Sequence, residues 1–201
     1  PPFPPDTPYT KCYCEENVYL LAQRFDADAT LTATWDPFVL FVSNCHRTVV
    51  LWKQKAGAIS GSTDGLVVWD YHVLFILRPK TGETPEVLAR DGTTVGVRSW
   101  VYDVDSTLPV PCPADVYFPD TFRPCAERYE SLFRVIAARE YLDNFASDRS
   151  HMLAYHSPIP RYPSICGPIA SARGVRHNLM EDFVDMSATT FGKVVGLSGL
   201  I

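Results

Sequence analysis

The segment from Val67 to Leu77 constrains the fold of this chain more than any other, because its odd-numbered and even-numbered positions form two distinct sets of side chains. Successive side chains of a strand point to opposite faces of a sheet, so the alternation predicts one long strand. Asp70 and His72 fall on the same face. Polar side chains in so apolar a strand must find hydrogen-bond partners or face solvent. One set is Trp69, Tyr71, Val73, Phe75 and Leu77, and the other is Val68, Asp70, His72, Leu74 and Ile76.

A helix is predicted from Cys14 to Phe25. Apolar residues recur there at i, i+3, i+4 and i+7, the spacing of one helix face. Glu15 and Glu16 stand in the first turn, where the helix dipole favours acidic side chains. The apolar positions are Val18, Leu21, Ala22 and Phe25.

The rest of the chain predicts short strands mixed with helical pieces. Short links between neighbouring strands favour antiparallel pairing, with helices on the faces of the sheet. The fold class is therefore α+β: a flexible proline-rich tail over residues 1–11, then one domain over 12–201 with a mainly antiparallel central sheet flanked by helices. The segments are strands at Phe38–Val42, Val49–Trp52 and Val97–Val104, a polar stretch at 78–96 with room for a short strand, helical pieces around Phe133–Ile136 within Thr121–Phe145, and a surface excursion at Leu153–Gly174.

Composition excludes several classes of protein. Hydrophobic residues make up 46% of the 201 residues, which is enough for a buried core without disulfides or metal. The net charge of −5 and the scattered lysines and arginines predict no nucleic-acid partner. Neither an apolar run of the roughly 20 residues that a bilayer requires nor a signal-peptide pattern is visible. We expect an intracellular protein with reduced thiols.

Three residues have the types and the chain order of a thiol acyl-transfer site. Cys14 opens a helix, whose free N–H groups favour a thiolate, although two following glutamates oppose that effect and a neighbouring imidazolium would be needed. His72 follows on a strand, and Asp103 lies on the next. Antiparallel pairing would let a carboxylate there fix the imidazole tautomer, but position alone leaves Asp70, Asp103 and Asp105 all open. This order is that of papain-like and transglutaminase-like enzymes.

Other candidates for chemistry are weaker. Cys12 and Cys14 form a CxC pair and Cys45 precedes His46, but CxxC and HxxxH spacings are lacking, so a zinc site is not expected. His151 lies in a polar loop that could line a site, although such loops are more often merely solvated. There is no P-loop and no GxGxxG motif, so nucleotide chemistry has no support.

The chain resembles the protein N-terminal glutamine amidohydrolases of the N-degron pathway, in blocks that run in family order from residue 12 to about residue 186. Two stretches depart from the family pattern, at Leu153–Ser157 and at Arg78–Arg98, and both lie away from the three residues above. The matching blocks are CYCEEN at 12–17, FVSN at 41–44, LWKQKA at 51–56, WDYHV at 69–73, YDVDSTLP at 102–109 and FASDRSHM at 145–152.

This resemblance implies a catalytic triad of Cys14, His72 and Asp103. It also implies a monomer that needs no cofactor and acts in cytosol and nucleus, converting N-terminal Gln of proteins and peptides to Glu ahead of arginylation. The free α-ammonium group of such a substrate should meet a carboxylate, for which Glu15, Glu16 and Asp70 are the candidates. The alternatives are a transglutaminase-like enzyme or peptidase acting on internal residues, and a module that binds N-terminal Gln without turnover.

Overall fold

A six-stranded sheet forms the centre of the molecule. The computed structural model describes residues 1–80, 87–88, 94–95, 98–152 and 158–200. Neighbouring strands run antiparallel throughout, in the order β10-β9-β1-β4-β7-β8, which confirms the predicted sheet. Its strands are β1 Trp35–Ser43, β4 His72–Pro79, β7 Trp100–Tyr102, β8 Cys112–Pro113, β9 Leu132–Ala137 and β10 Lys193–Gly196.

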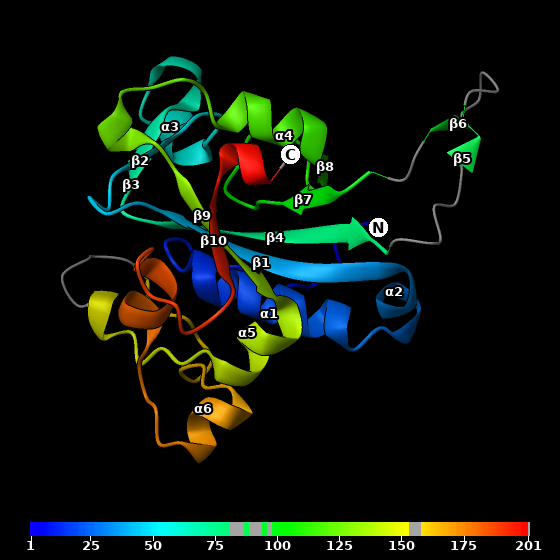
Figure 1. Ribbon diagram of the computed structural model, residues 1–201, viewed down its shortest axis with the longest axis vertical. Coiled ribbons are helices and arrows are strands. Elements are labelled where there is room, and N and C mark those ends of the chain that lie inside the picture. The colour runs from blue at the N-terminus through cyan, green and yellow to red at the C-terminus, as the bar shows by residue number, and fades with distance from the viewer. Residues whose placement is uncertain (81–86, 89–93, 96–97, 153–157, 201) are drawn as a thin grey trace.

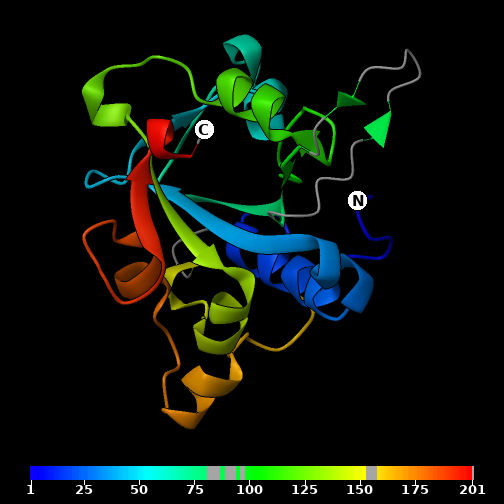
Figure 2. The ribbon, with the colours of Figure 1, turned by 45° about the vertical axis from the view of Figure 1, so that its right-hand side comes forward.

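Helices cover both faces of this sheet (Figure 1). The lower face in that view carries α1 Cys14–Asp26, α5 Ala138–Asn144 and α6 Pro168–Ala172, and the upper face carries α3 Lys55–Ile59 and α4 Ala114–Thr121. Figure 2 shows the same layers after a turn of the molecule. Smaller elements are α2 Ala29–Thr34, the paired strands β2 Val49–Leu51 and β3 Val67–Trp69, the paired strands β5 Val87–Leu88 and β6 Thr94–Val95, 3-10 turns at Thr63–Gly65, Glu127–Tyr129, Ser150–Met152 and Leu197–Gly199, and a π-helix at Leu179–Val184.

Alternation along the central strands builds a separate core on each face. In β4, Val73 and Phe75 pack toward α1, while Leu74 packs toward α4, and all three are buried. Phe25 of α1 stacks on Phe75 with ring centroids 5.0 Å apart. Burying each side chain of this size contributes about 1.5–3 kcal/mol, so the two layers are held chiefly by apolar burial.

The predicted strand Val67–Leu77 is in fact two strands, and the prediction of one element was wrong. The chain leaves β3 at Trp69 and enters β4 at His72, and the two strands belong to different sheets. At the break, Ser43 Oγ donates to the Asp70 carbonyl at 2.8 Å, and the Asp70 carboxylate accepts from the next backbone N–H at 2.9 Å. Side chains thus satisfy backbone groups that a continuous strand would pair. Asp70 is exposed and His72 is buried.

Two other segments differ from prediction. The helical pieces predicted around Phe133–Ile136 are present as the 3-10 turn Glu127–Tyr129 and as α5, but the apolar patch itself lies in β9, paired on both edges with β1 and β10. The strand predicted at Val97–Val104 is limited to β7 at Trp100–Tyr102, and Val97 lies outside the described residues. The stretch 78–96 contains β5 and β6 among positions outside the description, and of Leu153–Gly174 the described part, from residue 158, is mostly exposed and contains α6.

The side chain of Arg134, on β9, is fully buried and holds the last part of the chain against the sheet. Every acceptor it uses there is a backbone carbonyl. The guanidinium therefore replaces its hydration shell with peptide dipoles. Its acceptors are the carbonyl oxygens of Phe183 at 3.0 Å, Phe191 at 2.7 Å, Ala188 at 2.9 Å and Asp185.

The N-terminal residues lie along α1. Phe3 packs against the core on that face, and Arg24 donates to the Asp6 carbonyl at 2.9 Å. Asn17 fixes Thr10 with two hydrogen bonds, each of 2.8 Å. Among the helices that the structure describes, none is both long enough and apolar enough to cross a membrane.

Candidate active site

Cys14 is the first residue of α1, as predicted. The chain turns into the helix at Cys12, whose φ of +67° lies in the left-handed region. This turn leaves Cys12 exposed and packs the half-buried side chain of Cys14 against the core. Of the two cysteines of the CxC pair, Cys14 is therefore the one directed into the molecule.

The surroundings of Cys14 favour the neutral thiol. Burial raises its pKa well above the ordinary value, and the charges of Glu15, Asp105 and Asp70 raise it further, against a hydrogen bond with the backbone of Val73 that lowers it. The sulfur lies 3.7 Å from Glu15 Oε2, within reach for donation of the thiol proton. The helix terminus alone does not produce a thiolate, so a base must take the proton.

His72 and Asp103 form a buried pair. Asp103 follows β7, which pairs with β4 as predicted, and its Oδ1 lies 3.0 Å from His72 Nε2. Each side chain is only 2% exposed. Of the three acids that the sequence left open, Asp103 is the one hydrogen-bonded to the imidazole.

Three further donors hold the Asp103 carboxylate. Tyr117, on α4, donates to Oδ2 at 2.6 Å, and Gln54 donates to the same oxygen at 3.2 Å. The backbone N–H of Asp105 donates to Oδ1 at 3.0 Å. Burial alone would raise the pKa of Asp103, but the charge and hydrogen bond of His72 and the two side-chain donors lower it overall. The carboxylate is thus ionised in place.

The pKa of the His72 imidazole is shifted in the opposite direction to that of Asp103. Burial alone would lower the pKa of His72, but the charge and hydrogen bond of Asp103, with the charges of Asp105 and Glu15, raise it above its usual value. The indole of Trp69 stacks on the ring, with centroids 5.6 Å apart. His72 is therefore suited to hold a proton that it receives.

Within the described residues, Cys14 and His72 are not hydrogen-bonded to each other, and they are connected through Val73. Val73, the neighbour of His72 in β4, contributes the backbone hydrogen bond to the Cys14 sulfur. Because Nε2 of His72 pairs with Asp103, Nδ1 is the ring nitrogen that remains for another partner.

A second polar cluster surrounds Glu15, and it brings together two residues that the sequence analysis named separately, Glu15 and His151. Its carboxylate is fully buried and accepts from the Tyr71 hydroxyl at 3.1 Å. His151 Nε2 lies 3.4 Å from Glu15 Oε1 and 3.4 Å from the Tyr71 hydroxyl. The density of polar residues around His151 was the available signal, and it did not distinguish this site from a solvated loop.

The other predicted substrate-binding acids lie in different settings. Glu16 is fully buried and makes a bidentate pair with Arg149, at 2.8 and 2.9 Å. Its carboxylate is thus neutralised within the protein. Asp70 is exposed at the break between β3 and β4.

One group of side chains in the described part of the chain has donor atoms close enough to hold a metal ion. His72, Asp103 and Asp105 each offer one atom, and these atoms lie within 4.8 Å of one another. The set is poorly suited to a resident metal, because Asp103 already accepts hydrogen bonds on both oxygens.

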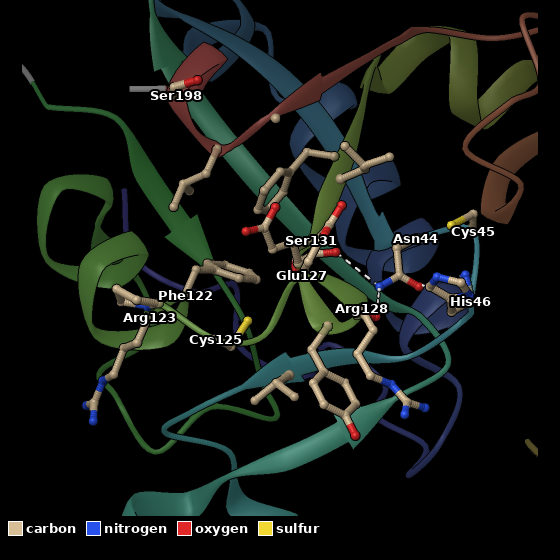
Figure 3. Close-up of a pocket in the computed structure, with 18 residues that line it drawn as sticks. Asn44, Cys45, His46, Phe122, Arg123, Cys125, Glu127, Arg128, Ser131 and Ser198 are labelled. Atoms are coloured by element: carbon tan, nitrogen blue, oxygen red, sulfur yellow. Dashed lines mark hydrogen bonds between the residues drawn. The ribbon is translucent and has the colours of Figure 1, made fainter.

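Two cavities in the described part of the chain differ in their position relative to Cys14. A small one of about 90 Å³ is lined by Cys14, Val73 and Asp105, with Phe3 and Tyr9 from the N-terminal residues. A larger hollow of about 870 Å³ opens elsewhere, and none of the three predicted triad residues lines it. Figure 3 shows this hollow, with Asn44, Arg123 and Ser198 around it.

Comparison with known proteins assigns the chain to a family. The sequence model of the family described as N-terminal glutamine amidase matches residues 9–201. The chain belongs to this family. A protein N-terminal glutamine amidohydrolase of Arabidopsis thaliana is 36% identical over 192 residues, which are 94% of this chain and 78% of that protein. A protein of the same name in Oryza sativa subsp. indica is 39% identical over 186 residues, which are 90% of this chain and 72% of that protein. Another in Bos taurus is 35% identical over 164 residues, which are 78% of this chain and 70% of that protein.

Proposed function

We propose that this protein hydrolyses the side-chain carboxamide of an N-terminal glutamine, releasing ammonia and leaving glutamate. The observation that carries the proposal is the buried His72–Asp103 pair, whose histidine precedes Val73, the residue that gives a backbone hydrogen bond to the half-buried Cys14 at the start of α1, in a chain of the N-terminal glutamine amidase family. The Arabidopsis and cattle relatives bear the name of that activity. The three residues act as a triad of the transglutaminase type, with Cys14 as the nucleophile.

The first half of the reaction transfers the acyl group to sulfur. His72 takes the thiol proton at Nδ1, and the Cys14 thiolate attacks the carboxamide carbon of the substrate. When the tetrahedral intermediate collapses, the C–N bond breaks and His72 returns its proton to the leaving ammonia. A γ-thioester remains on Cys14. The raised pKa of His72 supports this role, because the imidazole retains the proton until the amine leaves.

The second half restores the enzyme. His72 takes a proton from water as the oxygen attacks the thioester carbonyl, the C–S bond breaks to release the side-chain acid of glutamate, and His72 returns its proton to the Cys14 sulfur. Asp103 orients the ring and stabilises the imidazolium in both halves. The donors that Tyr117 and Gln54 supply to Asp103 keep its charge fixed throughout. All the groups in this cycle are side chains or water, so it requires no cofactor.

The cellular setting follows from the same resemblance. The product, N-terminal Glu, enters the N-degron route of protein degradation ahead of arginylation. The protein acts as a monomer in cytosol and nucleus, and its partners are proteins and peptides with a free N-terminal Gln. Gel filtration and cell fractionation test these two statements directly.

Ammonia release from defined peptides tests the reaction. A peptide beginning with Gln should release ammonia and show amide-to-acid conversion at residue 1 only, and chelation with EDTA should leave the rate unchanged. N-terminal Asn should be a poor substrate. Its missing methylene costs about 10–200-fold in a fitted pocket, and a misplacement of about 1 Å costs on the order of 100-fold more.

The same assay separates the alternatives. A shortened peptide would indicate a peptidase, and an adduct with an added amine would indicate a transglutaminase. Binding of the Gln peptide without release of ammonia would indicate a recognition module. Equal deamidation of an internal Gln would refute the proposal, since nothing would then depend on the N-terminus.

A further inference from the structure

The cavity at Cys14 contains one charged side chain among the described residues that line it, and this is Asp105. The other lining groups near the sulfur are apolar or neutral, including Val73, Tyr102 and Val104. Asp105 is half-buried, so a molecule in the cavity can reach its carboxylate. A substrate that brings a cation to Cys14 would meet Asp105 first.

The other acids near Cys14 are poorly placed to accept that cation. Both oxygens of Glu16 are bound by Arg149, and those of Asp103 by His72 and its supporting donors. Glu15 is fully buried; its Oε2 accepts from the Tyr71 hydroxyl, and its Oε1, which has no hydrogen-bond partner among the described residues, lies 3.4 Å from His151 Nε2 and outside the cavity. None of these three side chains lines the cavity.

Within the part of the chain that the structure describes, the Asp105 side chain accepts one hydrogen bond, and its donor is neutral. The Tyr9 hydroxyl, in the N-terminal segment, donates to Asp105 Oδ1 at 2.5 Å. A cationic N–H donor on that oxygen would make a stronger, charge-assisted bond than a phenol does. Tyr9 therefore marks the direction from which a donor can approach.

We infer that Asp105 binds the α-ammonium group of the substrate and so selects an N-terminal residue. This rests on the proposed function and names its specificity residue. In glutamine, four bonds separate the α-nitrogen from the carboxamide carbon, a span of up to about 5 Å with bonds of ~1.5 Å. Asp105 and Cys14 line one cavity of about 90 Å³, so both ends of the residue can be held at once.

A pair of substrates tests this role. One is a peptide beginning with Gln, and the other is the same peptide with the α-amine replaced by hydrogen. For Asp105→Asn, kcat/KM for the Gln peptide should fall on the order of 100-fold, as expected when one partner of a desolvated ion pair is removed. Activity on the desamino peptide, already poor, should change by no more than a few fold, so that the preference for the amine is lost.

Controls make the outcomes distinct. Asp115→Asn removes an exposed carboxylate of equal charge, on α4, and should leave both rates unchanged; thermal unfolding should show that both variants are folded. An equal loss on the two peptides would overturn the inference, because Asp105 would then act only through His72. Unchanged kcat/KM for the Gln peptide would overturn it as well. If the wild-type protein released ammonia from neither peptide, the proposed function would fail and this inference with it.

Discussion

Removal of the Tyr117 hydroxyl should weaken catalysis without disturbing any group that touches the substrate. Tyr117 is fully buried, and its hydroxyl donates to Asp103 Oδ2 at 2.6 Å. A hydrogen bond to a charged group contributes about 1.5–3 kcal/mol. If Asp103 is needed at full charge when His72 is protonated, Tyr117→Phe should lower kcat/KM roughly 10- to 150-fold, at 1.4 kcal/mol for each factor of ten.

The same substitution should change how stability depends on pH. Asp103 has a lowered pKa, so its contribution is present above the ordinary carboxyl value of about 3.9 and is lost as the pH falls through the folded value. His72 has a raised pKa, so its contribution is complete below about 6.5 and is lost as the pH rises through the folded value. Because Tyr117 acts on the ionised form of Asp103, the difference in unfolding free energy between wild type and Tyr117→Phe should be largest above about pH 4 and should shrink as the pH falls through the folded pKa of Asp103.

A matched variant separates this effect from the loss of a buried hydroxyl in general. Tyr19, also buried, donates to the backbone carbonyl of Leu142 at 2.9 Å. Tyr19→Phe should cost about 0.5–1.5 kcal/mol of stability and leave kcat/KM unchanged. The measurements are ammonia release at saturating and limiting peptide, and urea unfolding at several pH values. If kcat/KM of Tyr117→Phe stays within a few fold of wild type, the carboxylate does not act as argued.

Two further predictions concern the nucleophile and the ion pair between Arg149 and Glu16. Cys14→Ala should abolish ammonia release while circular dichroism shows that the fold is intact, and His72→Ala should be equally damaging. Cys12→Ala should keep most of the activity. Comparable rates for the two cysteine variants would contradict the assignment of Cys14 as the nucleophile. Arg149→Met should lower the unfolding free energy by about 3–5 kcal/mol in urea, because it leaves the buried Glu16 carboxylate without its partner. A loss below about 1 kcal/mol would mean that water reaches Glu16.

The local pattern of apolar residues predicted those helices and strands in which the apolar face or run of the sequence is also the part that is buried in the structure. The helix at Cys14 and the strand around Phe38–Val42 were predictable because each has one apolar face or run that can be buried in only one way. The alternation from Val67 onward was misleading at Asp70. There the backbone is satisfied by the Ser43 side chain, 27 residues away in the chain, and no local pattern reveals such a partner.

The site shows the same limit. The residue types and their order indicated Cys14, His72 and an acid, but the sequence left three acids open. Only the pairing of β4 with β7 brings Asp103 to the imidazole, and only the placement of α4 brings Tyr117 to Asp103. Supporting residues of this kind are far apart in sequence, and each has an ordinary local context.

The buried Arg134 side chain has a consequence for biosynthesis. All four of its carbonyl acceptors lie at residues 183–191, which leave the ribosome 49 to 57 residues after Arg134 itself. Until those residues emerge, a nascent chain that had packed β9 against β1 would enclose a guanidinium without acceptors, at a cost of several kcal/mol. The sheet should therefore reach its native packing around β9 only after residue 191 has emerged. Ribosome-bound chains that end before residue 183 should remain sensitive to protease in β9, and those that extend past residue 191 and the exit tunnel should not.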